Sequence, residues 1–224
     1  MRRRAVLLVG TVLAALLVAS GVALAATVSC KGGGAKCVGT NRDDRITGTE
    51  RADRIFAKDG DDNVIAQGGN DIIRGGAGYD RIGGQDGNDD IAGGEDPDIL
   101  EGRAGDDLLE GELGIDYIEG GAGDDTMSGD DDTTSDGDYD EMYGEEGNDT
   151  LLDEAPNDED HAHGGAGDDT IDVADGDGED IVLCDGGGYV PNEGVDTVEL
   201  DSGDYIFDPD NCEVVLEQEP PAAP

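Results

Sequence analysis

The chain has 224 residues and a formal net charge of -44, because 57 acidic side chains face only 13 basic ones. This acidity argues against nucleic-acid binding, which requires a basic surface. Aromatic residues make up only 4% of the chain, and low hydrophobicity with high charge is typical of intrinsic disorder. On composition alone, the simplest interpretation is a solvated, disordered acidic chain.

Residues 1–25 have the pattern of a secretory signal peptide. Three arginines follow Met1, an apolar run extends to Ala26, and Ala23-Leu24-Ala25 is a small-residue cleavage site. An uncleaved membrane anchor is the alternative, because the run is close to the about 20 residues that a membrane span needs. Both interpretations place the rest of the chain outside the cytoplasm, and cleavage predicts a secreted, extracellular protein.

From residue 39 to residue 128 the chain repeats every nine residues. The unit is Gly-Gly-x-Gly-x-Asp-x-U-x, in which U is aliphatic, and Gly75–Gly83 is a full copy. The aspartates at position 6 are Asp44, Asp53, Asp62, Asp71, Asp80, Asp89, Asp98, Asp107, Asp116 and Asp125. Disorder does not need a fixed register, so this period indicates a repeat architecture.

Residues 129–183 continue the pattern with interruptions. An insertion is expected at 129–134, and shorter slips at 153–154 and 173–174. Copies of the unit return around Asp140, Asp149, Asp160, Asp169 and Asp180, with weak echoes at Asp196 and Asp204. We expect the extra residues to loop out from turns while the repeats keep stacking.

Both ends of the repeat region carry cysteines, and export favours disulfides. Of the three possible pairings, we favour the local ones, Cys30 with Cys37 and Cys184 with Cys212. A four-cysteine zinc site is disfavoured, because no C-x-x-C spacing occurs. We therefore expect an N-terminal cap at 26–38, a C-terminal cap at 184–216, and a Pro/Ala-rich disordered tail at 217–224.

The nonapeptide resembles the RTX, or hemolysin-type, calcium-binding repeat. The resemblance implies an all-β fold, a parallel β-roll in which two units form one coil and several Ca²⁺ ions lie between stacked turns. It implies that the first six residues of a unit form the calcium-binding turn and the last three a short strand. The candidate metal ligands are Asp62, Asp71, Asp80, Asp89, Asp98, Asp107, Asp116, Asp125, Asp149 and Asp169.

The residue types suit this chemistry. Glycine allows a positive φ and lets the backbone approach an ion closely, and Ca²⁺ takes six to eight oxygen ligands from carboxylates and backbone carbonyls. One buried aliphatic side chain in nine residues is a small core against the entropy of ordering the chain. Stacked aspartates also repel one another, so we expect the protein to fold on binding calcium.

Three repeats depart from the consensus. Arg42 and Arg51 stand at position 4 of the first two units, where other units have glycine. Two interpretations stay open: drift in an end coil, or guanidinium groups that replace the charge of calcium. Either predicts weak or absent Ca²⁺ at Asp44 and Asp53. In the seventh unit Asp96 takes the place of the position-4 glycine, which leaves the geometry of that turn open.

No catalytic motif occurs in the chain, and we expect no enzymatic activity. His161 and His163 flank Ala162 on a predicted strand, where both would face solvent; a transition-metal site is the less favoured interpretation. The expected function is an exported, monomeric calcium-binding protein with no nucleic-acid partner and no small-molecule substrate. The alternative is a cell-surface adhesion or interaction scaffold that calcium rigidifies, with an unidentified cell-envelope or extracellular partner.

Overall fold

The computed structural model describes residues 25–31, 36–130, 139–152, 160–173, 180–185, 196–200, 204–206, 212 and 214–217. Every regular element in these ranges is a β-strand. The predicted signal peptide lies outside them except for Ala25, and the predicted tail except for Glu217. In the part of the chain that is described, no helix is long and apolar enough to cross a membrane.

The strands form two parallel sheets of ten strands each. The odd-numbered strands make one sheet: β1 (Ala26–Ser29), β3 (Asp44–Thr49), β5 (Asn63–Gly68), β7 (Arg81–Asp86), β9 (Ile99–Ala104), β11 (Tyr117–Ala122), β13 (Glu141–Glu146), β15 (His161–Ala166), β17 (Ile181–Asp185) and β19 (Tyr205–Ile206). The even-numbered strands make the other: β2 (Lys36–Val38), β4 (Arg54–Asp59), β6 (Ile72–Ala77), β8 (Asp90–Glu95), β10 (Leu108–Leu113), β12 (Thr126–Asp130), β14 (Thr150–Leu152), β16 (Thr170–Asp172), β18 (Thr197–Leu200) and β20 (Val214–Glu217).

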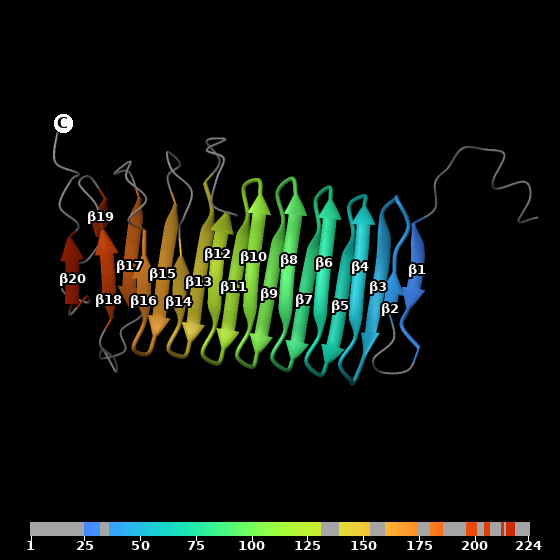
Figure 1. Cartoon of the computed structure of the whole chain (residues 1–224), viewed down its shortest axis with the longest axis horizontal. Helices are drawn as coiled ribbons and strands as arrows, with labels where there is room; N and C mark the ends of the chain where they lie inside the picture. Colours follow the sequence, from blue (N-terminus) through green and yellow to red (C-terminus); the bar gives the residue numbers. More distant parts are fainter. Residues whose placement is uncertain are drawn as a thin grey trace, which may run out of the picture.

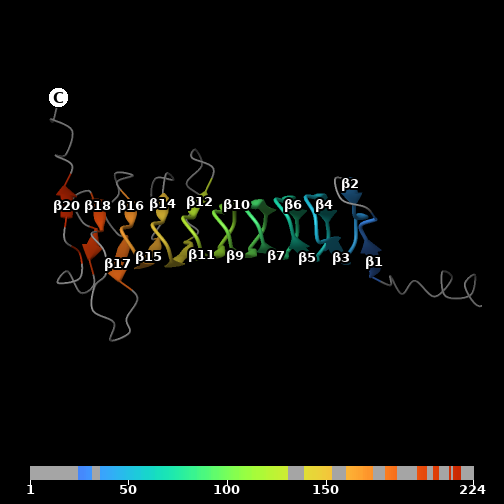
Figure 2. The ribbon, with the colours of Figure 1, turned by 90° about the horizontal axis from the view of Figure 1, so that it is seen from below.

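The chain alternates between the two sheets and so winds into a roll. Even and odd strands lie on opposite sides (Figure 2), and β1 and β20 lie at opposite ends of the long axis (Figure 1). Ile82 pairs with Val64 on one side and with Leu100 on the other. Each coil therefore contains two nonapeptides, which confirms the predicted parallel β-roll.

The strand ladder continues across the interruptions, whose own residues lie outside the described ranges. Tyr117 in β11 pairs with Glu141 in β13, so the register resumes after the first insertion. The position of that insertion differs from the prediction of 129–134, because Gly129 and Asp130 belong to β12. Because β12 extends to Asp130, the extra residues of the first insertion follow Asp130 in the sequence.

A single file of aliphatic side chains fills the roll. Alternation along each strand turns position 8 inward, and this residue is fully buried from Ile46 to Val198. Positions 6 and 1 also face inward, where Asp80 and Gly84, for example, are buried. A narrow interior of this kind has room for one large apolar side chain per nonapeptide.

Both predicted caps are coils of the roll. β1 pairs with β3 and β2 with β4 at one end, and β18 pairs with β20 at the other. The disulfides join Cys30 to Cys37 and Cys184 to Cys212, as predicted. Cys30, Cys37 and Cys184 are buried in the core, so each bridge packs against the interior near one end of the stack.

Candidate metal centre

The backbone of the turns is left-handed at positions 2 and 4 of the nonapeptide. In the unit that begins at Gly75, Gly76 has a φ of 130° and Gly78 a φ of 107°. Residues other than glycine accept this conformation at some turns. Asp96 has a φ of 73° at position 4 of the seventh unit, so that turn keeps the same geometry without its glycine.

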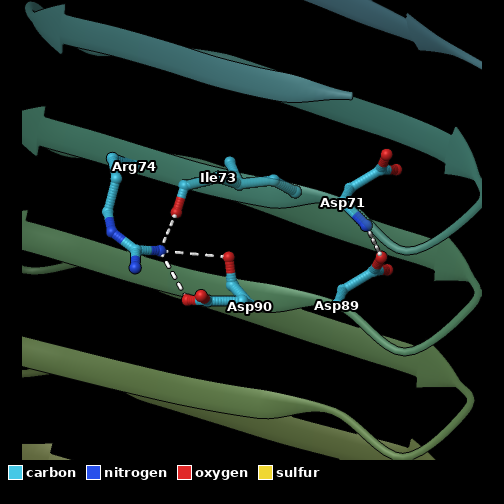
Figure 3. A network of polar contacts seen from close by, with 5 residues as sticks. All are labelled: Asp71, Ile73, Arg74, Asp89 and Asp90. Carbon is cyan, nitrogen blue, oxygen red and sulfur yellow. Dashed lines mark hydrogen bonds and ion pairs between the residues drawn. The ribbon is translucent and has the colours of Figure 1, made fainter. Parts of the chain in front are cut away.

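The position-6 aspartates form two buried columns, one along each edge of the roll. The backbone N–H of Asp62 donates to Oδ1 of Asp80 at 2.8 Å, and that of Asp80 donates to Oδ1 of Asp98 at 2.7 Å. Figure 3 shows the equivalent bond in the other column, from Asp71 to Asp89 at 2.7 Å. Each carboxylate thus uses one oxygen to hold the neighbouring coil.

The second oxygen of these carboxylates is buried and accepts no hydrogen bond among the described residues. This holds for Oδ2 of Asp62, Asp71, Asp80, Asp89, Asp98, Asp107, Asp125 and Asp149. Buried polar atoms are almost always partnered in folded proteins. A column of carboxylate oxygens in this state indicates a ligand that supplies positive charge.

These oxygens converge with backbone carbonyls over the position-1 glycine. A Cβ atom on Gly75 would lie 2.4 Å from Oδ2 of Asp80 and 2.4 Å from the carbonyl oxygen of Gly93. A Cβ on Gly102 would lie 2.5 Å from Oδ2 of Asp107 and 2.7 Å from the carbonyl oxygen of the next coil. At these two turns only glycine leaves the space to the oxygens, and hard carboxylate and carbonyl donors are what Ca²⁺ prefers.

Burial makes the negative charge costly when no cation is bound. It raises the pKa of Asp98 to about 8, that of Asp80 to about 7 and that of Asp89 to about 6. At Asp98 the neighbouring carboxylates of Asp116 and Asp80 raise the pKa further, against the lowering effect of the backbone N–H donor. A divalent cation between the turns would remove this penalty.

All ten aspartates that the sequence singled out as ligands lie in the two columns, each at most 3% exposed. Four further aspartates of the interrupted region also lie in the columns, namely Asp140, Asp160, Asp180 and Asp196. The sequence placed repeat copies or a weak echo at them but did not count them among the ligands. Oδ1 of Asp140, for instance, accepts the N–H of Asp116 at 2.7 Å. The signal that identifies them is an aspartate two residues before an inward side chain, even where the glycines are missing.

The ion pairs bear on the interpretation that arginines replace calcium in the first two units. The ion pairs between described residues join Arg74 to Asp90, and Arg81 and Arg103 to Glu101. None of them joins an arginine of the first two units to the turn aspartates there. The interpretation that guanidinium groups replace calcium therefore finds no support in these contacts.

The histidine pair lies on the outer face of the odd-numbered sheet. Ala162 is buried between them, as predicted, and His163 stacks on Tyr143 with ring centroids 4.5 Å apart. Burial and the neighbouring His161 lower the pKa of His163. No group of three or more His, Cys, Asp or Glu side chains converges on one point within the described ranges.

A parallel β-roll with stacked carboxylate and carbonyl oxygens in its turns has the architecture of a calcium-binding solenoid. Comparison with known families agrees with this class. Segments of the chain match the RTX calcium-binding nonapeptide repeat: 38–73, 47–82, 65–100, 83–118, 101–135, 134–152 and 157–182. Because these matches cover more than half of the chain, it belongs to that family. No curated protein shows significant similarity to it.

Proposed function

We propose that the protein is an exported calcium-binding β-roll that folds as Ca²⁺ fills its turns and has no catalytic activity of its own. The ligands are the ten predicted aspartates, from Asp62 to Asp169, together with turn carbonyls. The observation that carries this proposal is the series of buried carboxylate oxygens that accept no hydrogen bond among the described residues, which at turns such as those of Asp80 and Asp107 face a carbonyl over the position-1 glycine.

Folding and calcium binding are coupled because neither the core nor the columns favour the ion-free fold. One aliphatic side chain per unit buries little apolar surface, while each buried column places carboxylates in successive coils. When the buried carboxylates carry neither protons nor cations, the free-energy cost of their desolvation is not compensated. Because the sites form only when coils stack, binding free energy becomes folding free energy.

Circular dichroism on the oxidised chain without residues 1–25 tests the coupling. We expect an unfolded spectrum in EGTA at pH 8, and a β spectrum on Ca²⁺ addition with a midpoint of roughly 0.1–1 mM, the range of extracellular calcium modules. Mg²⁺ should substitute poorly, because it requires a smaller octahedral site. The same spectrum in EGTA and in Ca²⁺ would refute the coupling.

Export is tested separately. Expression of the full chain in a secreting host should yield extracellular protein whose mature N-terminus, read by mass spectrometry, lies close to Ala26. Protein that keeps residues 1–25 and stays with the membrane fraction would instead favour the anchor interpretation.

A second candidate function, the interaction scaffold, is favoured by one edge of the roll. On this edge position 5 of four consecutive turns carries an exposed apolar residue, which we call the apolar row: Tyr79, Pro97, Ile115 and Tyr139. The opposite edge instead has a ladder of hydrogen-bonded polar side chains such as Asn88 and Asp106.

The negative charge of the chain indicates which kind of partner would bind the apolar row. No lysine or arginine follows Arg103, and Glu95 and Asp96 lie exposed beside Pro97. A basic segment with apolar side chains would match both properties, whereas a second copy of this acidic chain would be repelled.

A labelled peptide of alternating lysine and leucine can serve as the probe, at 0.15 M salt in saturating Ca²⁺. We expect the double variant Tyr79→Ser with Ile115→Ser to bind it at least several-fold more weakly than the unaltered chain. The matched control, Asn88→Ser on the opposite edge, should bind as the unaltered chain does. Equal binding by all three proteins would show attraction by charge alone and remove the support for a scaffold.

A further inference from the structure

The first turn of the repeat block is closed by a threonine. Thr40, at position 2, donates its backbone N–H to Oδ2 of Asp44 at 2.5 Å. Its hydroxyl Oγ1 lies 3.1 Å from both carboxylate oxygens, and the N–H of Ala26 reaches Oδ1 at 3.2 Å. Both oxygens of this buried carboxylate are therefore engaged by protein donors.

The second turn repeats the arrangement one nonapeptide later. The backbone N–H of Thr49 donates to Oδ2 of Asp53 at 2.7 Å, and the Thr49 hydroxyl donates to the same oxygen at 2.8 Å. Oδ1 of Asp53 keeps no hydrogen bond among the described residues. The engaged atom is Oδ2, the oxygen that faces the position-1 glycine in the open turns.

The backbone of these two turns differs from that of the later ones. Neither Thr40 nor Thr49 has a left-handed φ, and neither do Arg42 and Arg51 at position 4. In the following units both positions are left-handed, for example at Lys58 and Gly60. Within residues 39–128 threonine occurs at position 2 only in the first two units, so the closed conformation and the threonine occur together.

We propose that the turns of Asp44 and Asp53 take no Ca²⁺ because Thr40 and Thr49 act as threonine latches on their carboxylates. Hydrogen bonds to an ionised carboxylate are strong and compensate its charge, and an N–H that points at Oδ2 places a donor where a cation would need an acceptor. The first coils are thus held by protein contacts, although the family repeat matches them as well. This inference rests on the proposed function, since it assigns which turns bind.

Counting bound ions by native mass spectrometry at saturating Ca²⁺ tests the latches. We expect Asp53→Asn to retain the full count of the unaltered chain, and Asp107→Asn, in an open turn, to lose at least one ion. Loss of an ion in Asp53→Asn as well would overturn the latch proposal. Failure of the unaltered chain to bind any Ca²⁺ would instead overturn the proposed function.

A gain of Ca²⁺ binding provides the converse test, because it does not require the disruption of an existing site. Thr49→Gly combined with Arg51→Gly restores the consensus at positions 2 and 4, and we expect at least one additional ion. Adding Asp53→Asn to this double variant should remove the gain. Thr47→Val, an outward position on the same strand, is the matched control and should leave the count unchanged. A folded double variant, verified by its circular dichroism in Ca²⁺, that gains no ion would contradict the proposal.

Discussion

Two regions of the roll share a period, an inward aspartate and an inward aliphatic residue: the first two turns, and the turns from Gly75 to Ser128. They differ in the hydrogen bonds that the aspartate carboxylate accepts. In the first turn Thr40 donates to Asp44, whereas Oδ2 of Asp80 accepts no hydrogen bond among the described residues. We infer that the nonapeptide period determines the fold of the coil. The residue at position 2 determines whether the carboxylate of a turn is hydrogen-bonded by the protein or remains available to an ion.

Charge also divides the roll, although its boundary lies within the block of residues 75–128. Every lysine and arginine of the chain lies at or before Arg103, and most of the acidic residues follow it. The ion pairs between described residues all involve strands from β6 to β9. Beyond them, positive charge has to come from solution, so the later coils should depend on calcium more than the first ones.

The largest effect should come from removing a ligand inside the open stack. We expect Asp80→Ala or Asp107→Ala to move the calcium midpoint to higher concentration by on the order of tenfold, which corresponds to about 1.4 kcal/mol. Asp44→Ala, in the latched turn, should move it little. Calcium titrations followed by circular dichroism measure all three variants, and equal shifts would erase the distinction between the two regions.

Protons should partly replace calcium in the open turns. The folded, ion-free roll raises the pKa of the inner aspartates from the ordinary 3.8 to between about 6 at Asp89 and about 8 at Asp98. The folded state therefore holds these protons to higher pH than the unfolded chain does. Their stabilisation is complete below pH 3.8 and is lost as the pH rises through about 6 to 8.

In EGTA, the β signal should accordingly be strongest near pH 4 and disappear toward pH 8, where added Ca²⁺ has its greatest effect. A pH series of circular dichroism spectra, with and without Ca²⁺, gives the measurement. An ion-free signal that grows as the pH rises would contradict the assigned direction.

Reduction of the disulfides should destabilise the ends of the roll and leave residues 75–128 folded. Cys184 and Cys212 are 28 residues apart, a loop for which a disulfide is worth about 3–4 kcal/mol in the chain-entropy model. In Ca²⁺, hydrogen exchange with reductant should show protection lost mainly after Val182, while residues 75–128 stay protected. Uniform loss along the roll would mean that the end bridges support every coil.

The smallest effect should come from the outer face. Arg74 forms an ion pair with Asp90 at 2.7 Å (Figure 3), and both side chains are more than one third exposed. An exposed pair of this kind contributes about 0.2–1 kcal/mol and is screened by salt. Arg74→Met should lower stability in urea by no more than that, and by less at 1 M NaCl. A larger loss would show that the faces, and not only the turns, hold the roll.

The sequence predicted the fold and the ligand columns because the period places an aspartate and an aliphatic residue in every unit. It did not predict the latches, because a threonine at position 2 looks like drift until its hydroxyl is seen on Asp44. Asp140 and Asp160 were recognised as repeat copies but not counted as ligands, because their units lack the consensus glycines, and strand pairing shows that they keep the register. The apolar row escaped because Tyr79 and Ile115 are 36 residues apart and come to lie on one edge only when coils stack.

Turn-by-turn hydrogen exchange of the oxidised protein at pH 8, in Ca²⁺ and in EGTA, tests the central claim most directly. The amides of residues 75–128 should be protected in Ca²⁺ and exchange freely in EGTA, because the buried carboxylates of this block, such as those of Asp80 and Asp107, need a cation when they are ionised. Protection of this block that is as strong in EGTA as in Ca²⁺ would show that the open turns hold together without the ion, and would contradict the account.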